Sequence, residues 1–594
     1  MTKGPRERNE RMPGKYAKYG NYDLSPHIKV EGLDDKALEG YPALLSEIKK
    51  RIKLGKKIFT FDLYPGVDER SLIEQLEKLR PDLLIRSEDC ALTPEELSRF
   101  FQDDLTEDRV FGYMTHKKLK DCFVPEKLES ARRKAERCSG VVFLVGVGAG
   151  LILRGDLYFY FNLSRWEIQL RYRAGMPNWH CGNADAPILT KYKRGFFIEW
   201  RMADRHKKAR FDDLDYMVDA NDRRNPKFIT GDAYRRALDQ ISRRPFRLKP
   251  YFDPGVWGGQ WMRGVFGLSQ DAPNYAWSFD GVPEENSIQL RFGGVSVELP
   301  CIDLVFYRPR QLLGERVHGR FGTEFPIRFD LLDTMEGGNL SLQVHPLTEY
   351  IQENFGMHYT QDESYYILDT EGNDACVYLG LKENADPAAM VADLKKADRG
   401  EGAFPAEKYV NRIPVKKHDH LLIPAGTVHC SGKNTMVLEI SATPYIFTFK
   451  LWDWGRVGLD GRPRPIHIEH GVKNIQWDRD TRWVRSNAVH QERVLHREEG
   501  LLVERTGLHP REFIETYRYT FRKPCAFPCN DSVHVLNLVD GGQITVTSPE
   551  QGFPPFDVHY AETFIIPASV GKYVLTPSGV SKGKTVMVID AFVR

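Results

Sequence analysis

The segment at residues 339–346 (NLSLQVHP) alternates polar and apolar side chains. Alternate side chains of an extended strand share a face, so Ser341, Gln343 and His345 would point one way and three aliphatic residues the other. The aliphatic set can pack between sheets while the polar set lines a cavity. A single histidine on a strand is more often structural than a ligand, so this segment alone does not define a metal site.

Two later segments supply further ligand types. Glu363 stands at the head of an apolar strand (QDESYYIL), and His429 follows a Pro-Gly turn at the start of another strand (LLIPAGTVHCSG). The strands of a barrel can bring such side chains to one inner face. With Gln343 and His345 they offer two nitrogens and two oxygens, a donor set that suits zinc with a position left open for substrate or water. The expected cofactor is therefore one zinc ion per chain.

The elements that would carry these residues begin after Pro245, where strand-like runs, aromatics and Gly/Pro turns dominate. This texture is typical of an antiparallel barrel or sandwich. One helical segment, DPAAMVADLKKADRG, interrupts it, and a further set of β patterns starts at Leu501. The segments HDHLLIPAGTVH and YAETFIIPASVGKY share an apolar-Ile-Pro-Ala-turn pattern, a weak repeat that indicates two barrels of one kind.

Residues from about 41 to 211 instead alternate strand and helix patterns, which predicts a doubly wound parallel sheet. Expected strands include KIFTFDLYPG, PDLLIR, VVFLVGVGA and DLYFYFNL, and Ser164 is expected to cap the helix that follows the last of them. The register YPGVDERS, residues 64–71, can be laid over a phosphate-binding loop, but it lacks both flanking glycines and has Arg70 in the lysine position. A degenerate domain similar to uridine-kinase-like phosphotransferases and a simple structural domain are both open readings.

Several motifs after residue 240 resemble type I mannose-6-phosphate isomerases, in the order that this family has them. They are RPFRLKPYFDPGVWGG, PRQLLG, FPIRFDLLDTM, LSLQVHP, the Glu-x-Tyr-Tyr at Glu363, YLGLK, IPAGTVH, DWGR and PRPIHI. The resemblance covers about 240–594. It implies a cupin (jelly-roll) fold, a zinc site formed by Gln343, His345, Glu363 and His429, and an aldose–ketose isomerase acting on a phosphosugar. Glu439 stands where the family has a glutamate after its last histidine ligand, and proton transfer or a structural role are equally open for it.

Two positions depart from the family pattern. Lys450 stands where the family has an arginine, and Gln361 replaces the lysine that precedes the metal-binding glutamate. Lysine keeps the charge of arginine but loses its planar fork. Ser341, Lys450 and Arg456 are the expected contacts to the phosphate or hydroxyls of the substrate, and the departures leave open whether that substrate is mannose 6-phosphate.

The expected organisation is thus a basic arm at 1–40, disordered or docked, a degenerate kinase-like α/β domain at 41–239, a catalytic cupin domain at 240–470 with a helical insertion near 384–412, and a cupin-like domain at 471–594. The leading hypothesis is a metal-dependent isomerase interconverting mannose 6-phosphate and fructose 6-phosphate or a related pair. The alternative is a non-catalytic protein that binds sugar phosphates, with the kinase-like domain as a sensor. A bifunctional kinase–isomerase is disfavoured by the missing glycine-rich loop.

Two other polar segments receive structural interpretations. Residues 191–210 (KYKRGFFIEWRMADRHKKAR) are expected to form a solvated charged helix with a buried aromatic face, the alternative being a clasp for a nucleotide, a sugar phosphate or nucleic acid. The HDH segment at 418–420 looks like a metal motif. The family has a glycine–aspartate turn there, so His418 and His420 are expected to be structural.

Composition bounds the remaining questions. The formal net charge is +2 with 84 basic and 82 acidic residues, which disfavours a nucleic-acid partner. Nine cysteines without a Cys-x-x-Cys pair indicate a reducing compartment. The most apolar run, VVFLVGVGAGLIL, is too short and too rich in glycine to span a bilayer. A cytoplasmic protein without a membrane partner is expected, and a homodimer is compatible with the sequence.

Overall fold

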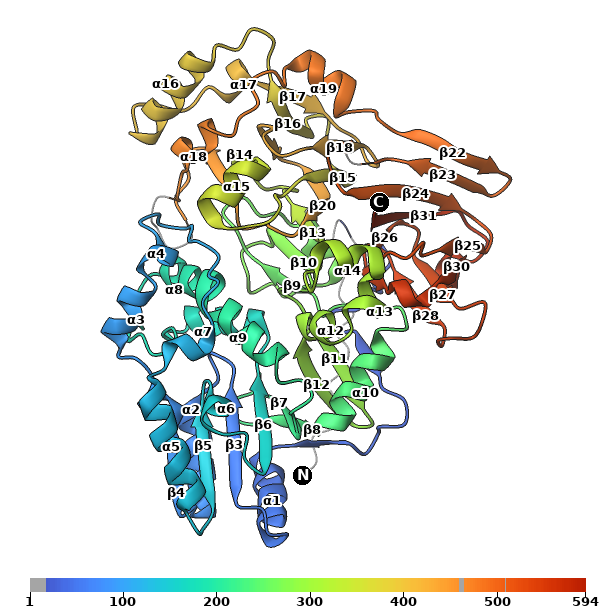
Figure 1. Cartoon of the computed structure of the whole chain (residues 1–594). Coiled ribbons are helices and arrows are strands. Elements are labelled where there is room, and N and C mark those ends of the chain that lie inside the picture. The colour runs from blue at the N-terminus through green and yellow to red at the C-terminus, as the bar shows by residue number, and fades with distance from the viewer. Residues whose placement is uncertain (1–15, 17, 459–463, 508) are drawn as a thin grey trace, which may run out of the picture.

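The structure is a computed structural model that describes residues 16, 18–458, 464–507 and 509–594. Three regions follow one another along the chain: an α/β region, a central β-sandwich and a C-terminal β-sandwich (Figure 1). The multidomain, mainly β architecture that the sequence predicts is confirmed, and it is consistent with cupin-like domains. Among the described residues, no helix combines the length and the apolar character needed to cross a membrane.

The α/β region is built on a seven-stranded sheet of order β2-β8-β7-β6-β3-β5-β4. Its strands are β2 (Ala37–Glu39), β3 (Ile58–Leu63), β4 (Leu83–Arg86), β5 (Val142–Gly146), β6 (Leu157–Asn162), β7 (Tyr216–Asp219) and β8 (Lys227–Thr230). The five strands at one end of this order, β7-β6-β3-β5-β4, are parallel. Strands β5 and β6 are buried along their whole length, as expected of parallel strands covered on both faces. Five of the seven strands thus form a parallel sheet as predicted, whereas β8 and β2 pair antiparallel at the other end. The kinase-like character of this region stays a prediction.

Ten helices accompany this sheet within the described residues. They are α1 (Tyr41–Lys53), α2 (Glu69–Leu76), α3 (Pro94–Phe100), α4 (Gln102–Leu105), α5 (Pro125–Arg137), α6 (Ala149–Ile152), α7 (Arg165–Arg173), α8 (Ile188–Arg194), α9 (Trp200–Lys208) and α10 (Gly231–Ile241). Ser164 caps α7 by accepting a hydrogen bond from the backbone N–H of Glu167, as predicted. One π-helical turn, Gly195–Glu199, joins α8 to α9.

The central sandwich has two antiparallel sheets, of order β18-β15-β20-β13-β10-β9 and β17-β16-β19-β14-β21. The first holds β9 (Tyr251–Asp253), β10 (Trp277–Gly281), β13 (Ile327–Asp333), β15 (Glu363–Thr370), β18 (His420–Ile423) and β20 (Thr435–Ala442). The second holds β14 (Leu342–Val344), β16 (Cys376–Leu381), β17 (Val410–Pro414), β19 (His429–Ser431) and β21 (Phe449–Trp452). Its helices are α11 (Trp261–Phe266), α12 (Ile302–Tyr307), α13 (Pro309–Leu313), α14 (Glu315–Phe321), α15 (Thr348–Phe355), α16 (Pro387–Asp398), α17 (Ala406–Tyr409), α18 (Ile468–Val472) and α19 (Thr481–Asn487). Helices α16 and α17 lie where the helical insertion is expected.

The C-terminal sandwich repeats this design with sheets β22-β23-β24-β31-β26-β29 and β25-β30-β27-β28. Its strands are β22 (Arg493–Glu498), β23 (Leu501–Arg505), β24 (Ile514–Phe521), β25 (Cys525–Pro528), β26 (His534–Asp540), β27 (Gln543–Thr547), β28 (Phe556–His559), β29 (Thr563–Ile566), β30 (Lys572–Pro577) and β31 (Val586–Val593). The two Ile-Pro-Ala segments end β18 and β29, the edge strands of the two six-stranded sheets. The weak repeat in the sequence therefore marks equivalent positions.

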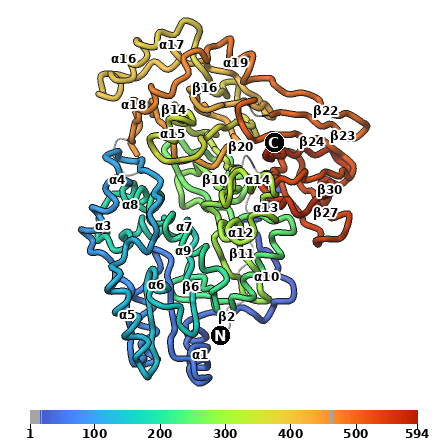
Figure 2. The backbone as a smooth tube through the Cα atoms, viewed as in Figure 1, coloured from blue at the N-terminus to red at the C-terminus, as the bar shows by residue number. Residues whose placement is uncertain are grey.

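The N-terminal segment is docked rather than free as far as the structure describes it; the first fifteen residues of the predicted basic arm lie outside the described residues. Strand β1 (His27–Lys29) joins a small sheet with β11 (Ser287–Phe292) and β12 (Val295–Pro300). The ring of Tyr22 stacks on Phe266 with centroids 3.9 Å apart, and Lys18 forms an ion pair of 2.8 Å with Asp369. The chain trace shows this segment running between regions that lie far apart in sequence (Figure 2).

Residues 191–210 are helical with buried aromatic residues, as expected, but several of their charged side chains are not solvated. Lys191, Lys193, Arg194 and Lys207 are buried along with the aromatic residues of the segment. These charges have internal partners: Nζ of Lys191 donates to the carbonyl of Tyr172 (2.7 Å), and the other three bind acidic side chains or carbonyls. Buried charges are stable only when they are paired. Because most of these partners lie on other elements, the composition of the segment alone could not predict that its charges are buried.

Candidate active site

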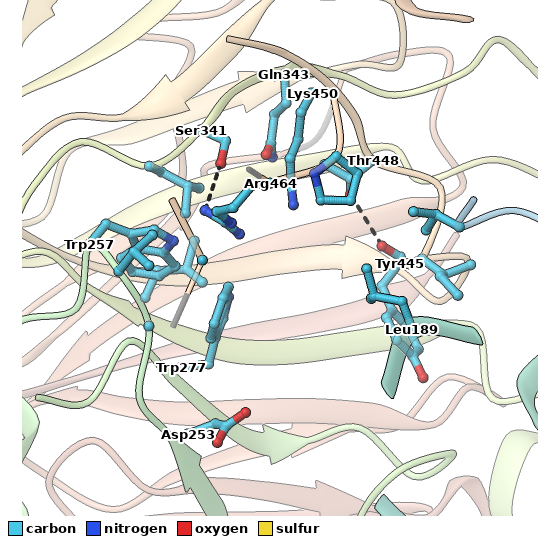
Figure 3. Close-up of a pocket in the computed structure, with 18 of the residues that line it drawn as sticks. Leu189, Asp253, Trp257, Trp277, Ser341, Gln343, Tyr445, Thr448, Lys450 and Arg464 are labelled. Atoms are coloured by element: carbon cyan, nitrogen blue, oxygen red, sulfur yellow. Dashed lines mark hydrogen bonds between the residues drawn. The ribbon is translucent and has the colours of Figure 1, made fainter. Parts of the chain in front are cut away.

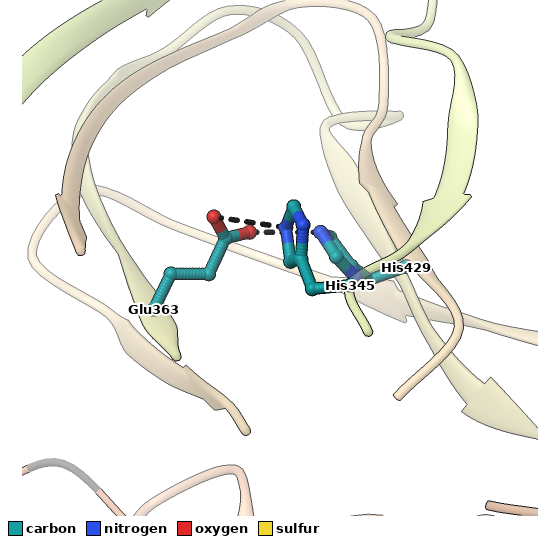
Figure 4. A group of neighbouring side chains, drawn as sticks. All are labelled: His345, Glu363 and His429. Atoms are coloured by element: carbon teal, nitrogen blue, oxygen red, sulfur yellow. Dashed lines mark ion pairs between the residues drawn. The ribbon is translucent and has the colours of Figure 1, made fainter. Parts of the chain in front are cut away.

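Three ligand-type side chains meet inside the central sandwich. Nε2 of His345 lies 3.2 Å from Oε2 of Glu363, and Nε2 of His429 lies 2.8 Å from Oε1 of the same carboxylate (Figure 4). All three side chains are at most 1% exposed. Within the described part of the chain, this is the one group of three or more histidine, cysteine or acidic side chains close enough to share a metal ion.

The strands explain this convergence. His345 directly follows β14, whereas Glu363 opens β15 and His429 opens β19, so the ligands come from both sheets of the sandwich. Gln343 of β14 pairs with His429 of β19, and its side-chain nitrogen lies 3.3 Å from Nε2 of His429. The four residues predicted as ligands thus lie together.

The hydrogen bonds of the two histidines fit a metal site. Nδ1 of His429 lies 2.9 Å from the carbonyl of Thr427, and Nδ1 of His345 lies 3.3 Å from the carbonyl of Phe447. A carbonyl can only accept, so both rings carry their proton on Nδ1 and turn the lone pair of Nε2 toward Glu363, the usual arrangement around metal-ligating histidines. Nε2 of His345 and Oε1 of Glu363 have no partner in hydrogen-bonding geometry among the described residues. The donor set therefore fits a divalent ion.

A cavity of about 770 Å³ opens beside this cluster, within the size range of small-molecule sites. Of the predicted site residues, Ser341, Gln343, Glu439 and Lys450 line it, as does Gln361. Figure 3 shows Lys450 and Arg464 directed into the same space as Ser341 and Gln343, with Trp257 and Trp277 across from them. The cavity combines an apolar, aromatic wall with a polar wall next to the metal cluster.

Glu439 of β20 is held by two side chains. Arg328 of β13 forms an ion pair with its Oε1, and Nε2 of Gln361 donates to the same oxygen (3.2 Å) and to Oε2 of Glu363 (2.9 Å). Burial raises the pKa of Glu439 well above its usual range, although Arg328 opposes this. A carboxyl group that can hold a proton thus stands between the metal cluster and the cavity.

Lys450 is half-buried in the cavity wall. Lys450 of β21 is the cross-strand neighbour of Gln343 of β14. Its side chain forms no ion pair or hydrogen bond with another described residue. Burial, followed in size by the nearby guanidinium of Arg464, lowers the pKa of Lys450 to about 7. A cation so placed is available to a negatively charged ligand.

Arg456, a predicted substrate contact, does not line the cavity, and its guanidinium binds Asp453 (2.7 Å). Arg464 takes its place: it contacts Asp453 (2.8 Å) and Ser341 (3.4 Å). Sequence reasoning missed Arg464, Arg328 and His467 as cavity residues, although Arg464 and His467 lie in the Pro-Arg-Pro-Ile-His-Ile motif and Arg328 lies in the FPIRFDLLDTM motif.

The two histidines of the HDH segment lie outside the metal cluster. His418 hydrogen-bonds to the hydroxyl of Tyr366 and His420 to that of Ser364, both at 2.8 Å. Burial lowers the pKa of His420 to about 3 and contributes most to the lowering at His418. Both rings are thus neutral packing elements, as expected.

Comparisons with known proteins divide the chain in two. Residues 40–243 match a family described as "Domain of unknown function (DUF8485)". The mannose-6-phosphate isomerase of Streptococcus mutans is 26% identical over 231 residues, which are 38% of this chain and 66% of that protein. Mannose-6-phosphate isomerase ManA of Bacillus subtilis is 25% identical over 237 residues, 40% of this chain and 69% of that protein.

A longer match is to the probable mannose-6-phosphate isomerase GmuF of Bacillus subtilis, 24% identical over 334 residues, 56% of this chain and 96% of that protein. Among solved structures, a mannose 6-phosphate isomerase from Bacillus subtilis aligns with 58% of this chain and 99% of its own, at 21% identity and a TM-score of 0.48. The chain therefore spans just under two thirds of the length of the Streptococcus relative and carries about 200 residues that match a different family.

Proposed function

We propose that the central sandwich is a metal-dependent aldose–ketose isomerase that interconverts mannose 6-phosphate and fructose 6-phosphate or a closely related pair. The observation that carries the proposal is the convergence of the His345, Glu363 and His429 cluster with Gln343, Glu439 and Lys450 around one cavity. Sequence similarity to proteins named mannose-6-phosphate isomerase supports it.

The reaction moves one proton between C1 and C2 of the sugar and a second between the two oxygens. It needs a base at the carbon, stabilisation of the enediolate and a contact for the phosphate. A zinc ion held by Gln343, His345, Glu363 and His429 would polarise the reacting carbonyl. In this proposal Glu439 takes and returns the carbon-bound proton, while Lys450 binds substrate charge.

The surroundings of Glu439 suit that role. Gln361 and Arg328 contact its Oε1, which holds the carboxylate in one orientation. Arg328 favours the carboxylate form of Glu439 that can take the proton, and burial favours the protonated form that keeps it between the two half-reactions. Because these groups share one cavity, the non-catalytic alternative is not favoured.

The test is a coupled assay of the zinc-loaded full chain on a panel of aldose and ketose phosphates. We expect turnover of mannose 6-phosphate or a related hexose phosphate. Glu439→Gln should lower kcat by at least about 100-fold, the typical contribution of a positioned acid–base group, with the metal content unchanged. A protein that binds sugar phosphates and carries one metal per chain but turns over none of them would contradict an enzymatic role.

A further inference from the structure

The cavity of the central sandwich has a second wall that comes from the α/β region. Arg109, Val110, Phe111, Arg173, Ile188 and Leu189 line it together with the predicted site residues. Residues 109–111 belong to the loop between α4 and the 3₁₀ helix Leu119–Cys122. This wall lies within residues 40–243, the part that matches the domain of unknown function.

The loop is fixed to the sandwich by packing and by a backbone hydrogen bond. The ring centroid of Phe111 lies 4.7 Å from that of His467, 5.3 Å from Phe449 and 5.5 Å from Phe355. The backbone N–H of Met114 donates to the carbonyl of Phe355 (2.9 Å). The loop that carries Arg109, an exposed residue of the cavity wall, is therefore fixed to the sandwich.

Most cations of the cavity already have carboxylate partners. Arg173 binds Asp253 through two hydrogen bonds of 2.9 and 2.7 Å. Arg328 contacts Asp330 (2.6 Å) and Glu439, and Arg464 contacts Asp453 (2.8 Å). Arg109 and Lys450 differ: among the described residues neither has an ion pair or a side-chain hydrogen bond, so their charge is available to a ligand.

His467 joins these two cations. Its side chain lines the cavity, the residue is 8% exposed, and both ring nitrogens lack hydrogen-bond partners among the described residues. Its backbone N–H donates to the carbonyl of Lys450 (2.8 Å), while its ring packs against Phe111, two residues from Arg109. A buried polar ring without partners is costly, so a ligand that accepts its hydrogen bond would remove that cost.

These contacts form a continuous path away from the metal cluster. Gln343 is the strand neighbour of Lys450, Lys450 adjoins His467, and His467 adjoins the loop that carries Arg109. An elongated sugar with its carbonyl end near Gln343 would direct its far end toward Arg109. Two unpaired cations and an imidazole donor are the groups that bind a phosphate dianion.

We propose that Arg109, together with Lys450 and His467, binds the terminal phosphate of the substrate, so that the α/β region completes the active site of the sandwich. This inference rests on the proposed function. The α/β region then sets specificity for a phosphorylated substrate instead of running a separate phosphotransfer reaction. Arg109 acts here as a specificity-determining residue.

The test compares Arg109→Gln, Arg109→Lys and the matched control Arg224→Gln in the zinc-loaded full chain. Arg224 is an exposed arginine of the same region between β7 and β8 and does not line the cavity. Calorimetry measures the affinity for fructose 6-phosphate and for inorganic phosphate, and kinetics measure KM and kcat. Arg109→Gln should weaken fructose 6-phosphate binding and raise KM about 10- to 100-fold, the range of one charge-assisted hydrogen bond. Arg109→Lys should recover part of the loss, and Arg224→Gln should match wild type.

The outcomes separate this inference from the proposed function. Unchanged affinity and KM in Arg109→Gln would overturn the phosphate subsite while leaving the isomerase proposal intact. Weakened binding in Arg109→Gln without turnover by any form of the protein would support the subsite and contradict the isomerase. Wild-type protein that binds neither fructose 6-phosphate nor inorganic phosphate would overturn the subsite directly.

Discussion

At the scale of single residues, the two departures from the isomerase pattern lie in one cavity. Gln361 places a neutral amide between Glu363 and Glu439, donating to both. Although Gln361 is neutral, Glu439 still has a cation beside it, because Arg328 of β13 forms an ion pair with it. Lys450 keeps a cation where the family has an arginine. The departures therefore change the hydrogen-bond donors of the cavity, while Lys450 and Arg328 still supply positive charge there.

The metal cluster leads to the first residue-scale prediction. Purified wild-type protein should contain about one divalent ion per chain, expected to be zinc, because His345, Glu363 and His429 lie close enough to share one ion. The His345→Ala/His429→Ala double variant should lose nearly all of it by elemental analysis. His420→Ala, which removes a buried histidine outside the cluster, is the control and should keep its metal. Full metal content in the double variant would remove these residues from the site.

Lys450 leads to the second prediction. Lys450→Met should cost about 2–4 kcal/mol of transition-state stabilisation, measured from the fall in kcat/KM. This is the size of losing one preorganised donor. Since its pKa is lowered to about 7, the ammonium is charged below that pH and neutral above it. The contribution of Lys450 to kcat/KM should therefore fade as pH rises through about 7.

The control for this pH dependence is Lys450→Arg, whose guanidinium stays charged over the whole range. Its kcat/KM should stay level between pH 6 and pH 9 where that of wild type declines. Equal profiles for the two proteins, or wild-type rates in Lys450→Met, would contradict a charged role for this side chain.

At the scale of elements, the two six-stranded sheets match strand for strand. Tyr365 of β15 pairs with Glu439 of β20, and Leu536 of β26 pairs with Asp590 of β31 in the corresponding register. Glu363 precedes Tyr365 by two residues, and His534 precedes Leu536 by two residues, so Glu363 and His534 occupy corresponding positions. In the C-terminal sandwich His534 forms an ion pair with Asp590 (2.8 Å). A histidine–aspartate pair thus stands at the corresponding positions there, and only the central sandwich provides a candidate metal site in the described residues.

The loop between β3 and α2 carries an element-scale prediction. Asp68 caps α2 by accepting a hydrogen bond from the backbone N–H of Ser71 (3.1 Å), and Tyr64 donates its hydroxyl proton to Asp204 (2.9 Å). An anion at this helix terminus would compete with the resident carboxylate of Asp68. We therefore expect no phosphorylation of nucleosides or sugars above background when the protein is incubated with ATP and magnesium.

The matched variant is Arg70→Ala, which removes the residue in the lysine position of the phosphate-loop register. Background phosphate release should be the same in this variant and in wild type. ATP-dependent phosphorylation that Arg70→Ala abolishes would show that the loop is functional after all.

At the scale of the whole molecule, a buried ion pair ties the α/β region to the central sandwich. Nζ of Lys207 in α9 lies 2.6 Å from Oδ1 of Asp303 in α12, with both side chains at most 1% exposed. Asn162 and Tyr234 also donate to Asp303, at 2.7 and 2.9 Å. One apolar core runs through both regions, and the C-terminal sandwich has a second one. The α/β region is thus built into the molecule rather than tethered to it.

This junction gives the whole-molecule prediction. Lys207→Met should lower the free energy of unfolding by about 3–5 kcal/mol, because it leaves Asp303 buried without its cation. The Lys207→Met/Asp303→Leu double variant should lose less, since no unpaired charge remains. Lys208→Met, at an exposed position on the same helix, should cost under about 1 kcal/mol. Urea unfolding followed by tryptophan fluorescence measures all three, and a Lys207→Met midpoint equal to that of wild type would contradict the coupling.

The sequence by itself determined what depends on local order. The period of two in residues 339–346, the alternation of strands and helices before residue 211, and the serine cap of α7 follow from neighbouring side chains. Family motifs added the positions of Gln343, His345, Glu363 and His429. These features were predictable because each depends on a short stretch of chain or on a pattern that a family shares.

Only the tertiary structure decided which distant residues share the cavity. Arg109 and Lys450 stand 341 positions apart in sequence, and no local pattern marks Arg109 as a neighbour of the cavity. The burial of the charged segment at 191–210 was hidden for the same reason, since its acceptors lie on other elements. Local periodicity shows which face of an element is apolar, but packing between elements decides which charges find partners and which stay available to a ligand.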